Sequence, residues 1–230
     1  EIGRQNRSEL YNLDVDRPVP LAPWELRFGL PERVDHTGAI VEDLLPEAIQ
    51  TCVHLIEEAE VDSIAVSFLF SFLNPAHEEA VLAALEKLPN NPFISISSRV
   101  LPEFREYERT STVVVNSYVG QVVSRYLNAL ENSLGHGLRI MQSSGGSITA
   151  RLAADQPVRT ILSGPAGGVV GAFYTGVQAG YPDIITLDMG GTSTDVSLCP
   201  SRIKETTGSQ VGGYPISVPM IDIHTVGAGG

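Results

Sequence analysis

The segment from Asp188 to Asp195 combines acidic, glycine and hydroxyl residues in a pattern that could bind a phosphorylated ligand. A short β-branched run, Ile184–Leu187, precedes it and an extended pattern resumes at Val196, so the segment predicts a tight hairpin with one acid on each side. The residues predicted to contact the ligand lie at its tip: Gly190, Gly191, Thr192, Ser193 and Thr194. Glycine lets backbone N–H groups approach an anion, hydroxyls can donate to phosphate oxygens, and carboxylates can hold Mg²⁺. The pattern therefore predicts a hairpin that binds nucleotide phosphates.

Asp188 and Asp195 are the predicted catalytic pair, and Asp188 is also the predicted metal ligand. One of them would orient Mg²⁺ or the attacking group at the terminal phosphate, because phosphoryl transfer depends mainly on positioning and charge neutralisation. A purely structural alternative stays open. In that alternative, Gly190 and Gly191 only supply unusual turn dihedrals, and Asp195 accepts hydrogen bonds from turn amides.

Two further glycine-rich segments could contribute to the same site. Ser163–Ala172 resembles a glycine-rich loop that opens a helix, where free N–H groups and the helix dipole favour anions. It lacks the Lys-Ser/Thr ending of a P-loop, and close helix packing through Gly167, Gly168 and Gly171 is an equal alternative. The second segment ends the chain after an expected strand and should begin another anion-binding helix. Its predicted nucleotide contacts are Gly227, Gly229 and Gly230.

Two other groups of charged residues have weaker claims to function. Arg105, Glu106, Glu108 and Arg109 surround Tyr107, and a helix-entry salt-bridge cluster of little individual value is favoured over a substrate surface. His224 lies two residues from Asp222, on one face of an expected strand. Two ligands do not make a metal site, so a satisfied polar pair is the favoured interpretation.

The elements that must position these residues follow from hydrophobic periodicity. Helical and extended patterns alternate from residue 46 onwards, which is typical of an α/β chain with a parallel sheet and crossover helices. Expected helices cover residues 46–60, 76–88, 110–134 and 167–180, and expected strands cover residues 63–70, 93–97, 138–142 and 216–225, in addition to the hairpin at 183–200.

Composition limits the classes of function. The 230 residues are 43% hydrophobic and 18% charged, which is typical of globular proteins with a real core. A net charge of −12 argues against nucleic acid or an anionic membrane as a broad-surface partner. The two cysteines, Cys52 and Cys199, are too few for a disulfide framework, and no apolar run approaches a membrane span. We therefore expect a cytoplasmic protein with reduced thiols.

The order of the motifs resembles the hydantoinase A/5-oxoprolinase family, within the superfamily of actin, Hsp70 and sugar kinases. The hairpin Asp188–Asp195 is similar to a phosphate motif of that superfamily. The closer family resemblance depends on five more segments: Ser71–Glu78, Phe104–Arg109, Gln142–Gly146, Ser163–Ala172 and His224–Gly230. These matches keep their order from about residue 60 to the last residue, which makes the resemblance more specific than any single motif.

The resemblance implies an α/β fold with ribonuclease-H-like (actin-like ATPase) lobes, in which mixed sheets carry flanking helices and ATP lies between the lobes. Residues 1–45 would form a loop-rich N-terminal segment, 46–150 the remainder of the first lobe, and 151–230 the start of the second lobe with the phosphate hairpin. The family normally has a first phosphate hairpin upstream and a long region downstream. We therefore expect an excised fragment, truncated at both ends, whose ATP turnover alone is weak or absent.

The resemblance also implies a reaction. The parent enzyme would use ATP and Mg²⁺ to phosphorylate and activate the ring carbonyl of a cyclic amide, of the hydantoin or 5-oxoproline type, before hydrolysis. A companion hydantoinase B-type subunit or domain would complete the reaction. Other readings stay open: an acetone-carboxylase-like ATP-dependent subunit, an ATP-binding switch of the actin or chaperone type, or a sugar or acyl kinase.

Overall fold

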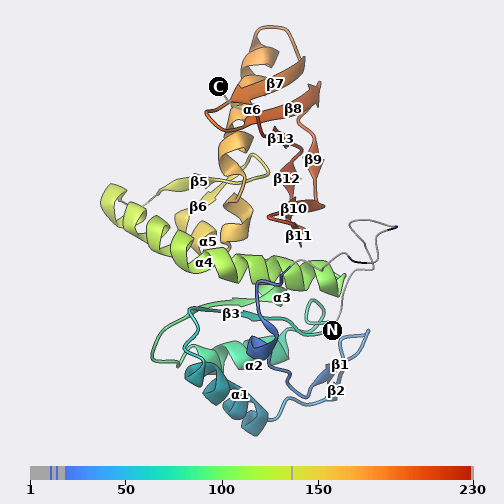
Figure 1. The fold of residues 1–230 in the computed structure, drawn as a ribbon, viewed down its shortest axis with the longest axis vertical. Helices are drawn as coiled ribbons and strands as arrows, with labels where there is room; N and C mark the ends of the chain where they lie inside the picture. Colours follow the sequence, from blue (N-terminus) through green and yellow to red (C-terminus); the bar gives the residue numbers. More distant parts are fainter. Residues whose placement is uncertain (1–10, 12–13, 15–18, 136, 229–230) are drawn as a thin grey trace. The chain divides into compact units, whose positions relative to one another are not determined.

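The computed structural model describes residues 11, 14, 19–135 and 137–228. Gly229 and Gly230, two of the predicted nucleotide contacts, lie outside the described residues. The chain divides into two compact units, which Figure 1 shows as a ribbon. Unit 1 contains Glu1–Gln121 and Gln210–Ile216, and unit 2 contains Val122–Ser209 and Ser217–Gly230.

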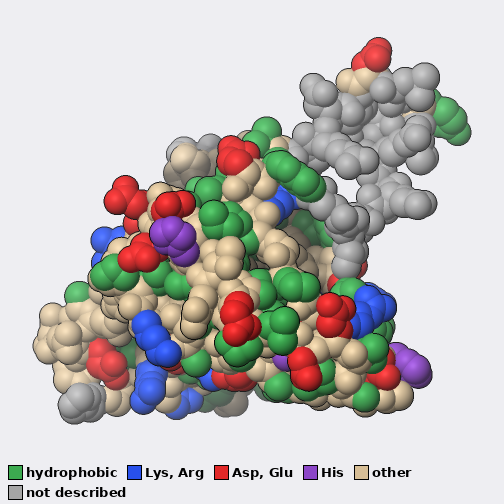
Figure 2. Space-filling model, turned by 90° about the horizontal axis from the view of Figure 1, so that it is seen from below, with side chains coloured by type: hydrophobic (Ala, Val, Ile, Leu, Met, Phe, Trp, Pro, Cys, Tyr) green, Lys and Arg blue, Asp and Glu red, His purple; other side chains and the backbone are tan. Residues whose placement is uncertain are grey.

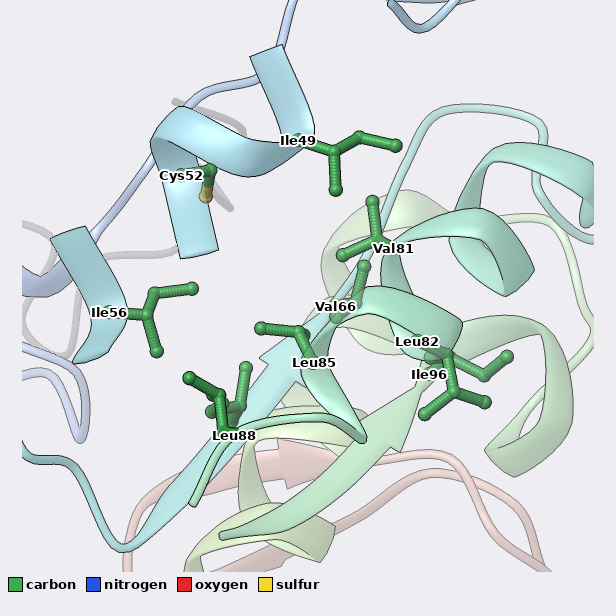
Figure 3. Close-up of a cluster of buried hydrophobic side chains, with 10 residues drawn as sticks. Ile49, Cys52, Ile56, Val66, Val81, Leu82, Leu85, Leu88 and Ile96 are labelled. Atoms are coloured by element: carbon green, nitrogen blue, oxygen red, sulfur yellow. The ribbon is translucent and has the colours of Figure 1, made fainter. Parts of the chain in front are cut away.

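The core of unit 1 lies between two helices and a parallel pair of strands. Strands β3 (Ser63–Val66) and β4 (Phe93–Ile96) pair in parallel, as predicted, with α2 (Ala76–Leu85) in the crossover between them. Helix α1 (Pro46–Glu58) begins with a proline in its first turn, where the missing N–H costs no hydrogen bond. Figure 3 shows the apolar side of α1, with Ile49 and Ile56, projecting toward α2.

Unit 1 also contains several short elements around this core. They are η1 (Trp24–Leu26), β1 (Arg33–Val34), β2 (Ile40–Glu42), α3 (Ser97–Val100) and β11 (Tyr214–Ile216). Strands β1 and β2 pair antiparallel, and β11 pairs with β10 (Ser209–Val211). The Tyr214 hydroxyl donates to the Val19 carbonyl over 2.6 Å, which fastens β11 to the beginning of the described chain.

The predicted strand 63–70 ends early, at Val66. The chain turns after it, and Phe70 has a left-handed φ of 56°, which no strand accommodates. The following loop is fixed from outside, because the Phe68 N–H donates to the buried carboxylate of Glu78 on α2 over 2.9 Å. A tertiary hydrogen bond therefore sets the end of this strand.

The long helix α4 (Glu106–Leu134) starts four residues before the predicted helix at Thr110, and this changes the interpretation of Arg109. The Arg109 side chain is completely buried and donates to the carbonyls of Glu103 (2.8 Å) and Phe68 (2.7 Å). Burial lowers the pKa of its guanidinium, while the charges of Glu106 and Glu78 act in the opposite direction. Within the described residues Arg109 forms no ion pair, so for this residue the expected helix-entry salt-bridge cluster is wrong, and its side chain instead joins the start of α4 to the loop after β3.

Unit 2 is built around an antiparallel sheet of order β13-β8-β7. Its strands are β7 (Asp183–Met189), β8 (Thr194–Pro200) and β13 (His224–Val226), so the predicted hairpin is present. Helix α6 (Ser163–Gln178) packs against one face of this sheet, with Val169, Cys199 and Ile221 in a shared core. Gly176 permits the close approach, because a Cβ there would lie 3.1 Å from Ile184 Cγ2 on β7 and 2.9 Å from the carbonyl oxygen of Tyr181, which precedes that strand.

A second core of unit 2 gathers on the C-terminal half of α4. Leu127 packs there with Ile148, Ala153 and Ala154. The elements that supply this core and join it to the sheet are β5 (Arg139–Met141), β6 (Ser147–Thr149), α5 (Ala150–Asp155) and η2 (Pro157–Thr160). The predicted strand 216–225 is broken: its residues belong to the end of β11, to β12 (Met220–Ile221), which pairs with β9 (Glu205–Thr206), and to β13.

The two compact units divide between Gln121 and Val122, within α4, whereas the expected domains divide between residues 150 and 151, and that domain division stays a prediction. Residues 122–150 group with the later part of the chain, because β5, β6 and the C-terminal half of α4 share a core with α5.

No helix of the described residues is long and apolar enough to cross a membrane. On the face seen in Figure 2, basic side chains are interspersed with carboxylates and apolar groups.

Candidate functional site

Three polar side chains form a row across the three-stranded sheet of unit 2. Asp188 on β7 lies directly opposite Asp195 on β8, and Asp195 lies directly opposite Thr225 on β13. Directly opposed residues of antiparallel strands project from the same face of a sheet. The sequence predicted the two acids as flanks of one hairpin, and the register brings Thr225 beside them.

The row lies on the face of the sheet that α6 covers. Ile184 packs into the core beneath α6, and Asp188, four residues further along β7, projects from the same face because side chains alternate. A Cβ built at Gly168 of α6 would lie 3.6 Å from Asp188 Oδ2, in ordinary van der Waals contact. The predicted glycine-rich segment therefore reaches the Asp188 carboxylate through Gly168.

Ser163–Ala172 is not a loop that precedes a helix. It forms the first turns of α6 itself, which starts at Ser163 with Pro165 in its first turn. The beginning of α6 is held by the buried Ser143, whose hydroxyl accepts a hydrogen bond from the Leu162 N–H over 3.1 Å. The Ser143 carbonyl in turn accepts from the Ile221 N–H over 2.8 Å. Through Ser143, the segment Gln142–Gly146 thus joins the start of α6 to β12.

The facing carboxylates repel each other. Like charges directly opposite across an antiparallel pair are destabilising, and among the described residues no basic side chain forms an ion pair with Asp188 or Asp195. Asp188 is exposed and Asp195 is half-buried, so a ligand can reach them. A hard divalent cation suits such a pair of oxygen donors.

Two carboxylates supply only part of a metal shell. Within the described part of the chain, no three acidic, histidine or cysteine side chains gather as a metal site. Mg²⁺ usually keeps several waters and binds through one or two carboxylates together with substrate phosphates. The donor set fits Mg²⁺ when it arrives with a phosphorylated ligand, and Asp188 and Asp195 are the residues that would hold it.

The tip of the hairpin leaves most of its predicted contacts accessible. The Gly190 N–H donates to the Ser193 carbonyl over 2.9 Å and closes the turn. Gly190, Gly191 and Thr192 are exposed and Ser193 is half-buried. Their backbone N–H and hydroxyl groups are therefore placed where a phosphate group could reach them, and these contacts stay predictions.

Thr194 is different from the other hydroxyl residues of the hairpin. Its side chain is buried, and its hydroxyl donates to the Ala228 carbonyl over 2.6 Å. A hydroxyl has one proton to donate, so this proton is used within the protein in this structure rather than for a phosphate. The contact holds the turn at Gly227, which is exposed, next to the base of the hairpin, where Val226 pairs with Thr194.

The Asp222–His224 pair is a surface contact. His224 Nε2 lies 3.7 Å from Asp222 Oδ1, the His224 side chain is largely exposed, and the Asp222 side chain is partly exposed. Exposed pairs of this kind contribute about 0–1 kcal/mol. The polar-pair interpretation of these two residues agrees with the structure.

Replacing Asp188 with asparagine should stabilise the isolated 230-residue chain. The change removes one of two facing negative charges and no described hydrogen bond. We expect a gain of about 0.5 kcal/mol in the free energy of unfolding at low salt, shrinking as salt screens the charges. Urea unfolding at two ionic strengths measures it, with Asp183→Asn at the far end of β7 as control. A loss of stability in Asp188→Asn would contradict the repulsion.

Comparison with protein families supplies the context for this site. The family model described as Hydantoinase/oxoprolinase matches residues 109–230, and the model of its N-terminal region matches residues 1–88. The chain belongs to the hydantoinase/oxoprolinase family. The family assignment expected from the motif order is therefore confirmed, and the matched range contains α6, the hairpin and β13.

Individual relatives extend the family assignment over the whole chain. An uncharacterized protein of Methanocaldococcus jannaschii is 36% identical over 248 residues, covering 100% of this chain and 36% of the relative. The alpha subunit of caprolactamase from Pseudomonas jessenii is 33% identical over 235 residues, covering 100% of this chain and 34% of the relative. The chain thus spans about a third of the length of these relatives.

Solved structures of family relatives match the fold. The crystal structure of ATP-dependent caprolactamase from Pseudomonas jessenii has a TM-score of 0.84 at 31% identity, covering 99% of this chain and 34% of that one. The nucleotide-free structure of acetone carboxylase, which carries out ATP-dependent acetone carboxylation, has a TM-score of 0.79 at 31% identity, covering 93% of this chain and 31% of that one. The hydantoinase/oxoprolinase chain is therefore an α/β protein with the fold of this part of both enzymes.

Proposed function

We propose that residues 1–230 are the part of an ATP-dependent cyclic-amide hydrolase that binds the nucleotide phosphates. The observation that carries this proposal is the unneutralised pair Asp188–Asp195, which faces α6 at Gly168 and adjoins the turn at Gly227. An unpaired acidic couple beside glycine-rich backbone favours a ligand that brings its own cation, as Mg-ATP does. The similarity to ATP-dependent caprolactamase supports the same conclusion.

Within this site each group has a definite task. Asp188 and Asp195 would hold and orient Mg²⁺, and the backbone N–H groups of Gly190 and Gly191 would donate to phosphate oxygens together with the Thr192 and Ser193 hydroxyls. Mg²⁺, when bound, neutralises charge on the oxygens of the two outer phosphates. Because phosphoryl transfer needs mainly positioning and charge neutralisation, these groups would contribute this chain's share of the first step, and the first phosphate hairpin expected upstream would supply the rest.

The substrate would be a ring of the hydantoin or 5-oxoproline type, or another lactam. Its carbonyl oxygen attacks the terminal phosphorus, the bond from that phosphorus to ADP breaks, and the ring nitrogen loses its proton, so the former carbonyl oxygen becomes part of a phosphate group on the ring carbon. Water then adds to that carbon, and the C–N bond of the ring breaks as nitrogen takes up protons, which leaves an acyl phosphate. A second water hydrolyses the acyl phosphate to a carboxylate and free phosphate. We place the hydrolytic step in a companion hydantoinase B-type subunit or domain, and the alpha-subunit name of the caprolactamase relative supports a multi-chain enzyme.

We further propose that the sheet β13-β8-β7 with α6 begins a ribonuclease-H-like lobe. An antiparallel strand trio with a glycine-tipped hairpin and a covering helix supports this assignment. An acetone-carboxylase-like role is the second candidate, because the fold match to that enzyme also covers most of the chain. In that case ATP would activate a ketone for carboxylation instead of a lactam for hydrolysis.

A substrate panel tests the proposal in the full-length polypeptide with its companion subunit. Lactams and hydantoins are offered in one arm, and ketones with bicarbonate in the other. We expect phosphate release to rise several-fold with a cyclic amide and to equal the amount of ring-opened product. Release that requires ketone and bicarbonate would replace the first candidate with the second. Release stimulated by neither would contradict both.

A further inference from the structure

Thr225 makes a direct hydrogen bond to one of the two carboxylates of the site. Its Oγ1 lies 2.6 Å from Asp195 Oδ1. An ionised carboxylate can only accept, so the threonine hydroxyl donates. Among the described residues no other side chain forms a hydrogen bond or ion pair with the Asp195 carboxylate, so Oδ2 has no such partner in the protein.

The two acids of the pair therefore differ in how they are held. Asp195 is half-buried and fixed by the Thr225 hydroxyl, whereas Asp188 is exposed and has no hydrogen-bond donor within the described chain. Ligands of a metal or phosphate group are commonly oriented by such hydrogen-bond donors, and loss of the donor weakens binding or activity about 10–100-fold. The pairing of β13 with β8 creates this difference between the two acids, and the sequence alone does not reveal it.

Two side-chain hydrogen bonds hold the backbone on either side of Thr225. On one side, the Ser197 hydroxyl of β8 donates to the Asp222 carbonyl over 2.8 Å. On the other side, the Thr194 hydroxyl donates to the Ala228 carbonyl over 2.6 Å. Thr225 lies between these two contacts, and a β-branched side chain in a strand has few rotamers. Its hydroxyl is thus held at a defined place relative to β8.

We propose that Thr225 is a positioning residue for Asp195: its hydroxyl holds Oδ1 and thereby presents Oδ2 to the Mg-nucleotide. The inference rests on the proposed function of the hairpin and adds to it a residue on a third strand. The bond is exposed, so by itself it contributes only about 0.5–1.5 kcal/mol to stability. A structural role would therefore leave activity nearly unchanged in a folded variant, while a positioning role would not.

Thr225→Val removes the hydroxyl and keeps the β-branched shape, and Thr225→Ser keeps the hydroxyl. In the full-length polypeptide with its companion subunit, we expect Thr225→Val to lower ATP turnover about 10–100-fold and to raise the Mg²⁺ concentration needed for half-maximal nucleotide binding, measured by isothermal titration calorimetry. Thr225→Ser should recover the rate to within about 3-fold of wild type. The control is Thr186→Val on β7, a buried threonine two residues from Asp188, which should keep wild-type Mg²⁺ dependence.

The outcomes distinguish failure of the role of Thr225 from failure of the proposed nucleotide site. Wild-type turnover and Mg²⁺ dependence in Thr225→Val, together with loss of turnover in Asp188→Asn, would overturn the role of Thr225 alone. Wild-type turnover in both variants would overturn the site itself. Should Thr225→Val fold poorly by circular dichroism, Thr225→Ala gives the same comparison, because it also lacks the hydroxyl.

Discussion

Asp188→Asn should reduce ATP turnover by about 10²–10³-fold in the full-length polypeptide while the protein remains folded. Asparagine keeps the shape of the side chain and removes its negative charge, so the site loses one of the two carboxylates proposed to hold Mg²⁺. Losses of about 10²–10³-fold are typical when one preorganised electrostatic group is removed from an active site. Phosphate release at saturating Mg-ATP and substrate measures the effect directly.

The matched control for this variant is Asp183→Asn, at the other end of the same strand. Asp183 is exposed and accepts a hydrogen bond from the Ser201 hydroxyl over 2.8 Å, far along β7 from the facing pair. It should retain turnover within about 2-fold, since surface substitutions away from a site have little effect. Because Asp188→Asn is also expected to gain stability, unfolding cannot explain its loss of activity. Wild-type turnover in Asp188→Asn would remove the hairpin from the mechanism.

The hairpin could be predicted from the sequence because its determinants are local. A β-branched run, two glycines and a second extended segment lie within 18 residues, and the turn needs nothing from elsewhere in the chain. Thr225 could not be predicted as part of the site. It is 30 residues from Asp195 in sequence, and only the pairing of β13 with β8 brings the two together. The proximity of Gly168 to the Asp188 carboxylate could not be predicted for the same reason, although both residues belong to motifs seen in the sequence.

Helix starts were less accurate than helix existence. Pro165 and its neighbouring glycines favoured a loop, yet proline is tolerated in a first helical turn, and the buried Ser143 fixes where α6 begins. The role of Arg109 was predicted wrongly, because its charged neighbours Glu106 and Glu108 indicated a salt-bridge cluster at the start of the helix. The structure buries that arginine because two backbone carbonyls accept its hydrogen bonds. Such partners lie in other elements, and local sequence does not reveal them.

Glu78→Ala should strongly destabilise unit 1. Its side chain is completely buried, and its carboxylate accepts from the Phe68 N–H (2.9 Å), the Ser97 hydroxyl (2.6 Å) and the Ser98 N–H (2.8 Å). These contacts join α2 to the loop after β3 and to the start of α3. Truncation leaves buried donors without an acceptor, at about 1–3 kcal/mol each, so we expect a loss of about 3–5 kcal/mol.

The neighbouring Glu79 provides the control, because it is also a glutamate on α2 but is more exposed than Glu78. Glu79 is partly exposed and pairs with Arg99, whose Nε donates to Oε1 over 3.0 Å. Exposed pairs of this kind contribute less than about 1 kcal/mol, so Glu79→Ala should shift the urea midpoint only slightly. Equal losses in the two variants would show that the buried carboxylate is not what joins these elements. A much larger loss in Glu78→Ala would identify a buried acid, invisible as such in the sequence, as the point at which α2, the loop after β3 and α3 are held together.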